Sequence, residues 1–140
     1  MEMYEALKSI TSKGVTISVN VGPSMETHGW IDLYIDDNTG WGLEVVRESN
    51  KLLEHLNRYN NKYKPIVDKS KKIINIDFVR QASSSKQKID NNFATFDSFK
   101  FSDKIEYFYI CFDPTYTMYN IFYKTGGQPK INETQVKIRE

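Results

Sequence analysis

The sequence contains one cysteine, Cys111, and no run of residues that is long and apolar enough to cross a membrane. A single cysteine excludes an intramolecular disulfide and a zinc site made of several cysteines. Because Cys111 lies within a run of aromatic and apolar residues, we expect a buried, unreactive thiol. The polar start of the chain, residues 1–14, lacks the features of a secretory signal, so we expect an intracellular protein, nuclear or cytoplasmic.

The chain also has no large excess of positive or negative charge. The chain has 19 lysines and arginines and 18 aspartates and glutamates, which gives a formal net charge of +1. Total charge therefore does not indicate a nucleic-acid partner, although a local basic patch would not show in the total. With 140 residues, the chain has the length of one domain with a hydrophobic core.

The stretch from Trp30 to Val46 has the pattern of two strands joined by a polar turn. Apolar and polar residues alternate on both sides of the breaker-rich segment 36–40. If these five residues form the loop, Ile35 faces Trp41, and one face of the hairpin becomes apolar. The residues on that face are Ile31, Leu33, Ile35, Trp41, Leu43 and Val45.

The same register places Asp32 directly opposite Glu44 on the other face of the hairpin. Two such carboxylates repel each other unless one is protonated or a cation offsets their charge, and oxygen ligands of this kind suit Mg²⁺ or Mn²⁺. A four-residue loop would instead place Asp32 and Glu44 on opposite faces as ordinary surface charges. The spacing alone leaves both interpretations open.

A helix is predicted to follow, beginning near Ser49, a favourable N-cap residue. Its buried positions at helical spacing are Leu52, Leu53, Leu56 and Tyr59. His55 and Arg58 stand three residues apart and share a face at the border of this apolar stripe. Either they act in catalysis beside the sheet, or they cap backbone carbonyls and pair with Glu54 at the edge of the helix.

The rest of the chain predicts further strands. They are expected at residues 15–21, 72–79, 105–112 and 118–123, and the last two form a late hairpin. Residues 72–79 are almost continuously apolar, which is typical of a strand buried on both faces. Within this strand we interpret Asp77 as a structural carboxylate that binds the backbone or Arg80.

Two segments lack a clear pattern. Residues 81–92 are polar and serine-rich and are predicted to form a mobile loop. Residues from 125 onward are either an edge strand or a disordered tail.

With a short amphipathic helix at residues 3–10, the predicted order is α-β-β-β-α-β followed by the late hairpin. This order indicates an α+β (α/β-like) fold with a central mixed sheet flanked by helices. We expect one domain over residues 1–140, with its core at about 1–80 and its hairpin at about 105–123. The first helix looks cropped at its start, so we expect the chain to come from a larger protein.

Several short motifs in this order resemble a known family. They are Trp41-Gly42-Leu43-Glu44, His55-Leu56-Asn57-Arg58-Tyr59, Lys62-Tyr63, Ile76-Asp77-Phe78 and the strand and turn from Ile105 to Asp113. Together with an acid in the second strand and another in the third, they resemble the restriction-endonuclease-like core of the PD-(D/E)XK superfamily. Within it, the chain from Trp30 to about Tyr123 is most similar to the nuclease-like domain of Crinkler proteins, an effector-related family.

The resemblance implies a magnesium-dependent phosphodiesterase that acts on nucleic acid. Asp32 would match the metal-binding aspartate of the family, and Glu44 would match the acid of its D/E-x-K motif. Both would hold Mg²⁺ or Mn²⁺, and Glu2 or Glu5 would extend the acidic cluster.

The chain departs from the motif at Val46, which stands where the superfamily has a lysine and can neither orient water nor neutralise charge. The candidates to replace that lysine are Arg47, Lys51, His55 and Arg58.

Two functions follow from these features. The first is a metal-dependent nuclease for DNA or RNA, with Asp32, Glu44, His55 and Arg58 as catalytic residues. The second is an inactive nuclease fold that binds nucleic acid or a protein partner within an effector or mobile-element protein. The four polar residues together favour the enzyme, whereas Val46 favours the binding module.

Overall fold

A computed structural model describes residues 17–21, 31–35 and 39–138 of the chain. The elements in chain order are β1 (Ile17–Val21), β2 (Ile31–Ile35), β3 (Trp41–Arg47), α2 (Leu52–Arg58), α3 (Lys64–Lys69), β4 (Lys72–Arg80), η2 (Gln81–Ser83), α4 (Lys86–Ser98), β5 (Ile105–Phe112), β6 (Met118–Thr125) and β7 (Asn132–Lys137). The predicted first helix, with Glu2 and Glu5, lies outside the described residues.

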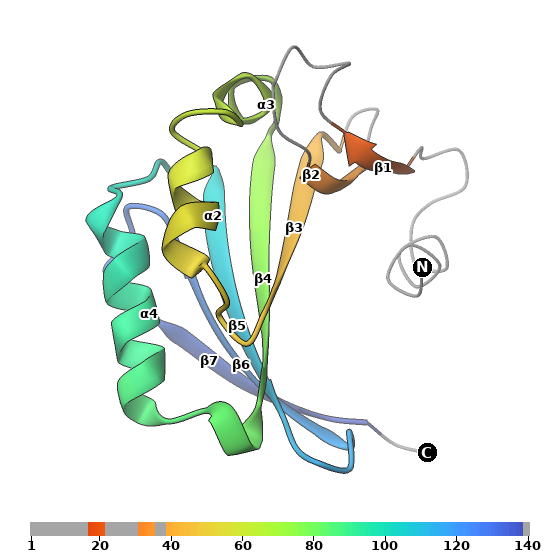
Figure 1. Ribbon diagram of the computed structural model, residues 1–140, viewed down its shortest axis with the longest axis vertical. Coiled ribbons are helices and arrows are strands. Elements are labelled where there is room, and N and C mark those ends of the chain that lie inside the picture. Colours follow the sequence, from red (N-terminus) through yellow and green to blue (C-terminus); the bar gives the residue numbers. More distant parts are fainter. Residues whose placement is uncertain (1–16, 22–30, 36–38, 139–140) are drawn as a thin grey trace.

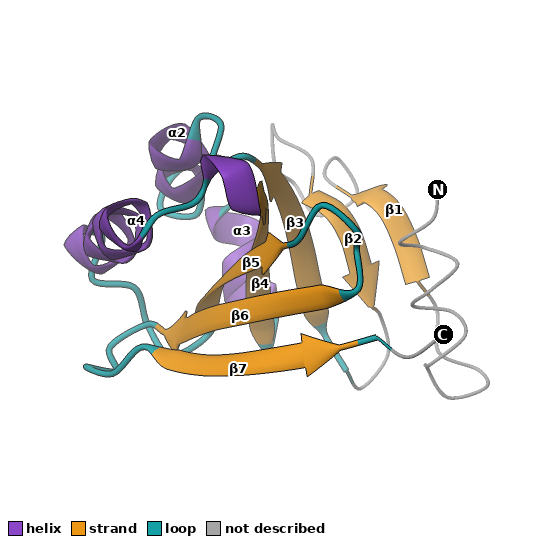
Figure 2. Ribbon diagram, turned by 90° about the horizontal axis from the view of Figure 1, so that it is seen from below, coloured by secondary structure: helices purple, strands orange, loops and turns teal. Residues whose placement is uncertain are grey.

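Seven strands of the described residues form one sheet, in which the order in space is the order in the chain, from β1 to β7. β3, β4 and β5 are parallel, and the other neighbours pair antiparallel. The two parallel connections contain the helices, α2 and α3 in the first and α4 in the second. Because such crossovers are right-handed and both step the same way across the sheet, they place these helices over one face (Figure 1, Figure 2).

The main core lies between that face and the helices. Its strand residues include Ile73, Val79, Ile105, Tyr107 and Tyr109, and its helix residues include Leu52, Leu56, Ile66, Phe93 and Phe96. The opposite face carries a smaller cluster made of Leu33, Ile35 and Leu43, against which Ile74 and Ile76 pack. This arrangement is an α+β fold with a mixed sheet, as the sequence predicts.

The predicted register of the β2–β3 hairpin is confirmed. Leu33 pairs with Leu43 and Ile35 with Trp41, which is the register of the five-residue loop. By strand alternation, Asp32 and Glu44 therefore project from the face opposite to Leu33 and Leu43, the face covered by the helices.

The predicted start of the central helix is wrong. α2 begins at Leu52, and its N-cap residue is Lys51 instead of Ser49. Glu48, Ser49 and Lys51 have φ values of 54°, 55° and 54°, in the left-handed region, so a right-handed helix cannot pass through them. Leu53, predicted to be buried, is 62% exposed because the helix presents this position to solvent.

Lys64 and Pro65 begin a separate helix, α3, which is absent from the predicted order of elements. Proline breaks the interior of a helix, and α2 does end before this point. In the first turn a proline is tolerated, and Pro65 lies in the first turn of α3. The short α3 buries Ile66 against the core.

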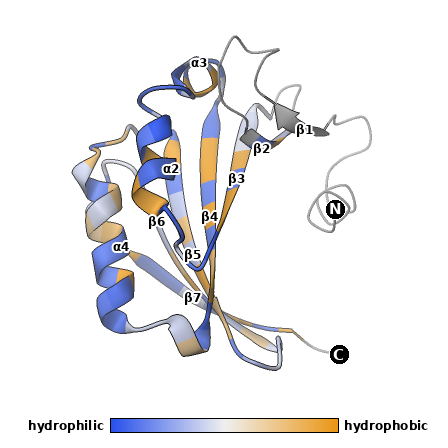
Figure 3. Ribbon diagram, viewed as in Figure 1, coloured by the Kyte–Doolittle hydropathy of each residue, from blue (hydrophilic) through white to orange (hydrophobic). Residues whose placement is uncertain are grey.

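The prediction of a mobile loop over residues 81–92 is also wrong. After η2, α4 begins at Lys86 and packs Phe93 and Phe96 into the core. Figure 3 shows that α4 is largely hydrophilic. Ile89 also packs against the core, so the helical spacing of Ile89, Phe93 and Phe96 shows only when the pattern is followed beyond residue 92.

The N-cap of α4 gives a direct test of this helix. Ser85 accepts a hydrogen bond from the amide of Lys88 over 3.0 Å. Ser85→Ala removes this cap, and we expect the free energy of unfolding in urea to fall by about 1 kcal/mol. Ser98→Ala, at the exposed other end of α4, is the control and should change it by a few tenths of that. Equal losses in the two variants would contradict the capping role.

The late part of the chain forms three antiparallel strands. β5 and β6 pair around a turn at Asp113, as predicted, and Cys111 on β5 is buried. The Thr115 hydroxyl, together with the amides of Met118 and Thr117, lowers the pKa of Asp113 to about 2. Of the two alternatives for the final segment, the structure shows the edge strand, β7. Within the described ranges, no helix has the length and apolar content needed to span a bilayer.

Candidate functional site

Glu44 on β3 is a carboxylate buried beneath α2. Its side chain is 3% exposed, and both of its oxygens have partners. Nδ1 of His55 lies 2.8 Å from Oε1, and the Tyr59 hydroxyl donates to Oε2 over 2.9 Å. His55 and Tyr59 are four residues apart, so they project from the same face of the helix. α2 thus supplies the groups that hold Glu44.

Arg58 places a positive charge beside this carboxylate. Its Nη1 lies 3.7 Å from Oε1 of Glu44, and its Nη2 donates to Glu54 over 3.0 Å. Although burial opposes it, the bond to Glu54 raises the pKa of Arg58, and the same bond lowers the pKa of Glu54. The predicted pairing of Arg58 with Glu54 is therefore present, and Arg58 also lies beside Glu44.

Tyr59 and Asn75 complete the cluster, although the sequence pattern does not predict them as site residues. Nδ2 of Asn75, which lies beside Glu44 in the sheet, donates to the Tyr59 hydroxyl over 2.8 Å. Burial, together with the charge of Glu44, raises the pKa of Tyr59 well above its usual value, so Tyr59 remains a donor to Glu44. The signal available in the sequence was an asparagine inside the apolar strand 72–79.

Asp32 reaches the same region from β2. Its Oδ2 accepts the amide of Val45 over 2.8 Å, next to Glu44 in the chain. The β2–β3 ladder extends as far as Leu33 and Leu43, so the carboxylate binds an amide just beyond the end of the ladder. The hairpin register therefore places Asp32, near the start of β2, beside Glu44 in the middle of β3.

Mg²⁺ is usually bound through one or two carboxylates and keeps several waters, so Asp32 and Glu44 are the residues that would hold such an ion or Mn²⁺. Asp32 and Glu44 provide the two carboxylates, and each Glu44 oxygen retains a second lone pair beside its hydrogen bond. The part of the chain that the structure describes contains no group of three or more His, Cys, Asp or Glu side chains that could hold a metal.

The position of the motif lysine is closed to solvent. Val46 is 1% exposed, on the helix-covered face of the sheet, where it pairs with Asp77. Arg47 follows in the same strand and projects from the opposite face, and Lys51 is exposed at the start of α2. Of the four candidate replacements for lysine, His55 and Arg58 are those whose contacts with Glu44 the structure shows.

Asp77 forms a second buried polar cluster on the same face. It accepts the amide and the hydroxyl of Ser49 over 2.9 and 2.6 Å and the hydroxyl of Tyr107 over 2.7 Å. Asn92 of α4 also donates to the Ser49 hydroxyl over 2.7 Å. The prediction of a structural carboxylate agrees with the bond to the backbone, but Arg80 bonds to Glu48 instead of Asp77.

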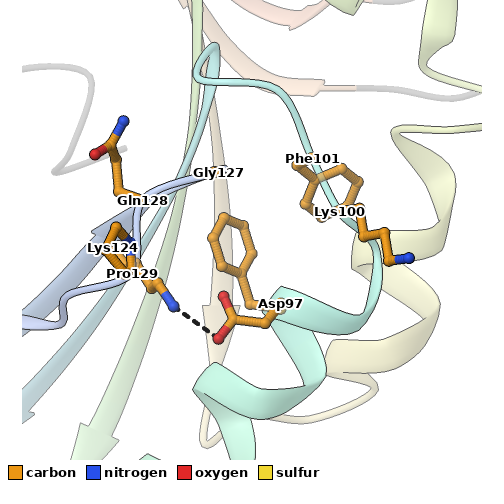
Figure 4. A pocket seen from close by; sticks show the side chains of 9 residues that line it. Asp97, Lys100, Phe101, Lys124, Gly127, Gln128 and Pro129 are labelled. Atoms are coloured by element: carbon orange, nitrogen blue, oxygen red, sulfur yellow. Dashed lines mark hydrogen bonds and ion pairs between the residues drawn. The ribbon is translucent and has the colours of Figure 1, made fainter.

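Two cavities lie near the end of α4. One of about 310 Å³ is shown in Figure 4, where Lys124 and Asp97 form an ion pair of 2.7 Å at its wall. A second, of about 390 Å³, is lined by three lysines, Lys64, Lys100 and Lys104, and by Tyr59. Glu44, Asp32, His55 and Arg58 line neither cavity, so the candidate site lies between the sheet and the edge of α2.

No family model, curated protein or solved structure matches this chain.

Proposed function

We propose that this chain is a nuclease-like domain that hydrolyses phosphodiester bonds of DNA or RNA with Mg²⁺ or Mn²⁺. The observation that carries the proposal is the cluster at Glu44, where a strand carboxylate is held by His55 and Tyr59 beside the charged Arg58. Asp32 adds a second carboxylate from the adjacent strand.

The order of the elements supports a restriction-endonuclease-like core. Three consecutive strands carry one acid on β2 and one on β3, helices follow, and β4 returns parallel to β3. This is the order in which the sequence resembles the PD-(D/E)XK superfamily, and on this proposal β5, β6 and β7 extend that core.

Each residue then has a defined task. Asp32 and Glu44 would hold the metal ion, whose contribution when bound is to polarise a phosphate oxygen and to lower the pKa of a bound water. Arg58 would offset the charge that grows on the phosphate oxygens. His55 binds Glu44 through Nδ1, so Nε2 is the ring nitrogen left to pass a proton to the leaving oxygen.

A second function has its own support. Val46 is buried where the motif lysine would stand, and both Glu44 oxygens already bind protein groups. These two features favour a nuclease fold retained as a nucleic-acid-binding or protein-binding module of an effector or mobile-element protein.

Thermal unfolding with metal tests the site directly. An ion that binds the folded state alone stabilises it, by about 2.7 kcal/mol at a concentration one hundred times its Kd. We expect Mg²⁺ or Mn²⁺ to raise the Tm of the wild type and to leave the Tm of Asp32→Asn unchanged.

Asp68→Asn, which alters a 60% exposed side chain on α3, is the matched control and should keep the full rise. An equal rise in Asp32→Asn would place the ion elsewhere, and the absence of any rise in the wild type would favour the binding module.

A further inference from the structure

β7 forms one edge of the sheet. It pairs with β6 on one side, and no strand of the described residues lies on its other side (Figure 2). All six of its residues are exposed. An edge of this kind presents unpaired amides and carbonyls that can bind another strand.

Two hydrogen bonds fix which backbone groups face outward. The amide of Ile138 donates to the carbonyl of Thr117, toward β6. The amide of Asp113 donates to the carbonyl of Met118, so Met118 of β6 directs its backbone groups toward β5 and not toward β7. Antiparallel strands alternate between inward and outward groups, so residues 132, 134 and 136 bond to β6. Residues 133, 135 and 137 therefore present their amides and carbonyls to the free edge.

We propose that β7 pairs antiparallel with β7 of a second copy of this chain, about a two-fold axis at Gln135. In this register Gln135 lies opposite Gln135 of the second copy, and Glu133 lies opposite Lys137 of the second copy. The three outward-facing residues of each strand are then all in hydrogen-bonded pairs, and two Glu–Lys pairs form across the axis.

Pairing of opposite charges favours this register over the registers shifted by two residues. A shift of the pairing by two residues in either direction keeps outward groups opposite each other, but it places Gln135 opposite Glu133 or opposite Lys137. Such a shift loses the opposite-charge pairs and leaves one outward residue of each copy without a partner in β7. The self-complementary spacing of Glu133, Gln135 and Lys137 therefore suits a second copy of the chain in one register.

Apolar side chains gather beside the same edge. Among the residues whose side chains are described, six large apolar side chains are exposed, and four of them belong to the end of the sheet where β6 begins and β7 ends. They are Tyr116, Met118, Val136 and Ile138, with exposed fractions of 61%, 37%, 40% and 48%. In the proposed register Val136 faces Thr134 of the second copy, so pairing would cover part of this surface.

Charge reversal tests the interface in the full chain. By sedimentation velocity across a concentration series, we expect a monomer–dimer equilibrium for the wild type. Glu133→Lys and Lys137→Glu each place like charges at both pairs, and each should weaken dimerisation by about tenfold or more. The double variant E133K/K137E restores opposite charges and should return the Kd toward that of the wild type. Lys130→Glu, an exposed position outside β7, is the control and should leave it unchanged.

A proline at the axis tests the backbone bonds separately. The amide of Gln135 faces outward, so Gln135→Pro removes bonds to the second copy and keeps the ladder to β6. We expect a monomer whose circular dichroism spectrum matches that of the wild-type monomer. A wild type that is monomeric at every concentration would overturn the proposal. So would dimerisation that survives Gln135→Pro, or a double charge variant that remains as weak as the single ones.

Discussion

Arg58→Ala is expected to lower the rate of DNA or RNA cleavage by about a hundredfold or more, the scale of losing one transition-state donor. The guanidinium stands 3.7 Å from Glu44 and stays charged at any working pH. It also reaches solvent, with a side chain 23% exposed, and so can contact a phosphate oxygen. A nuclease assay under Mg²⁺ and Mn²⁺, with kcat and KM separated, measures the effect.

Two controls separate chemistry from structure. Glu54→Ala removes the exposed partner of Arg58 and should change the rate little, because the arginine keeps its place beside Glu44. Arg47→Ala removes an exposed positive charge on the other face of β3 and should have no effect on the rate. If Arg58→Ala unfolds the protein, or if the wild type cleaves neither DNA nor RNA, the binding module replaces the nuclease proposal.

Asp77→Ala is expected to cause the largest loss of stability. The carboxyl group is fully buried and accepts three hydrogen bonds, two from Ser49 and one from Tyr107. Its removal leaves these donors without their partner, which costs about 3 kcal/mol or more and lowers the Tm by on the order of 10 °C.

Thermal and urea unfolding measure this loss. Asp68→Ala, whose carboxylate is 60% exposed in a pair with Lys64, should change the free energy of unfolding by less than about 0.5 kcal/mol. Similar small changes in both variants would show that the Asp77 cluster contributes little to the fold.

The β2–β3 hairpin is a part of the fold that the sequence alone predicts correctly. Its register follows from alternation on both sides of a breaker-rich loop, because a shift by one residue would turn Leu33 and Leu43 away from their cluster. The buried strand at residues 72–79 and the late hairpin follow from the same local periodicity. From the hairpin register alone, Asp32 and Glu44 could be placed together.

The sequence does not predict features that depend on contacts between residues far apart in the chain. Ser49 has the chemistry of a helix cap, but its hydroxyl is used by Asp77, a residue of β4, and the backbone around it takes left-handed values. The polar first half of α4 gives no sign of Phe93 and Phe96 beyond it. The roles of Tyr59 and Asn75 depend on the packing of α2 over β3 and β4, which local periodicity does not specify.

The described strands lie in the sheet in the same order as in the chain, and this order affects how the protein folds. Each strand joins the strand made just before it, and the longest steps, from Trp41 to Lys72 and from Ile73 to Ile105, each span one helical crossover. Among the described strands, none must wait for a later segment to be inserted beside it, so the contact order of this sheet stays low for a structure with parallel pairing. The described strands can therefore join the sheet in chain order, from β1 toward β7, as the chain leaves the ribosome.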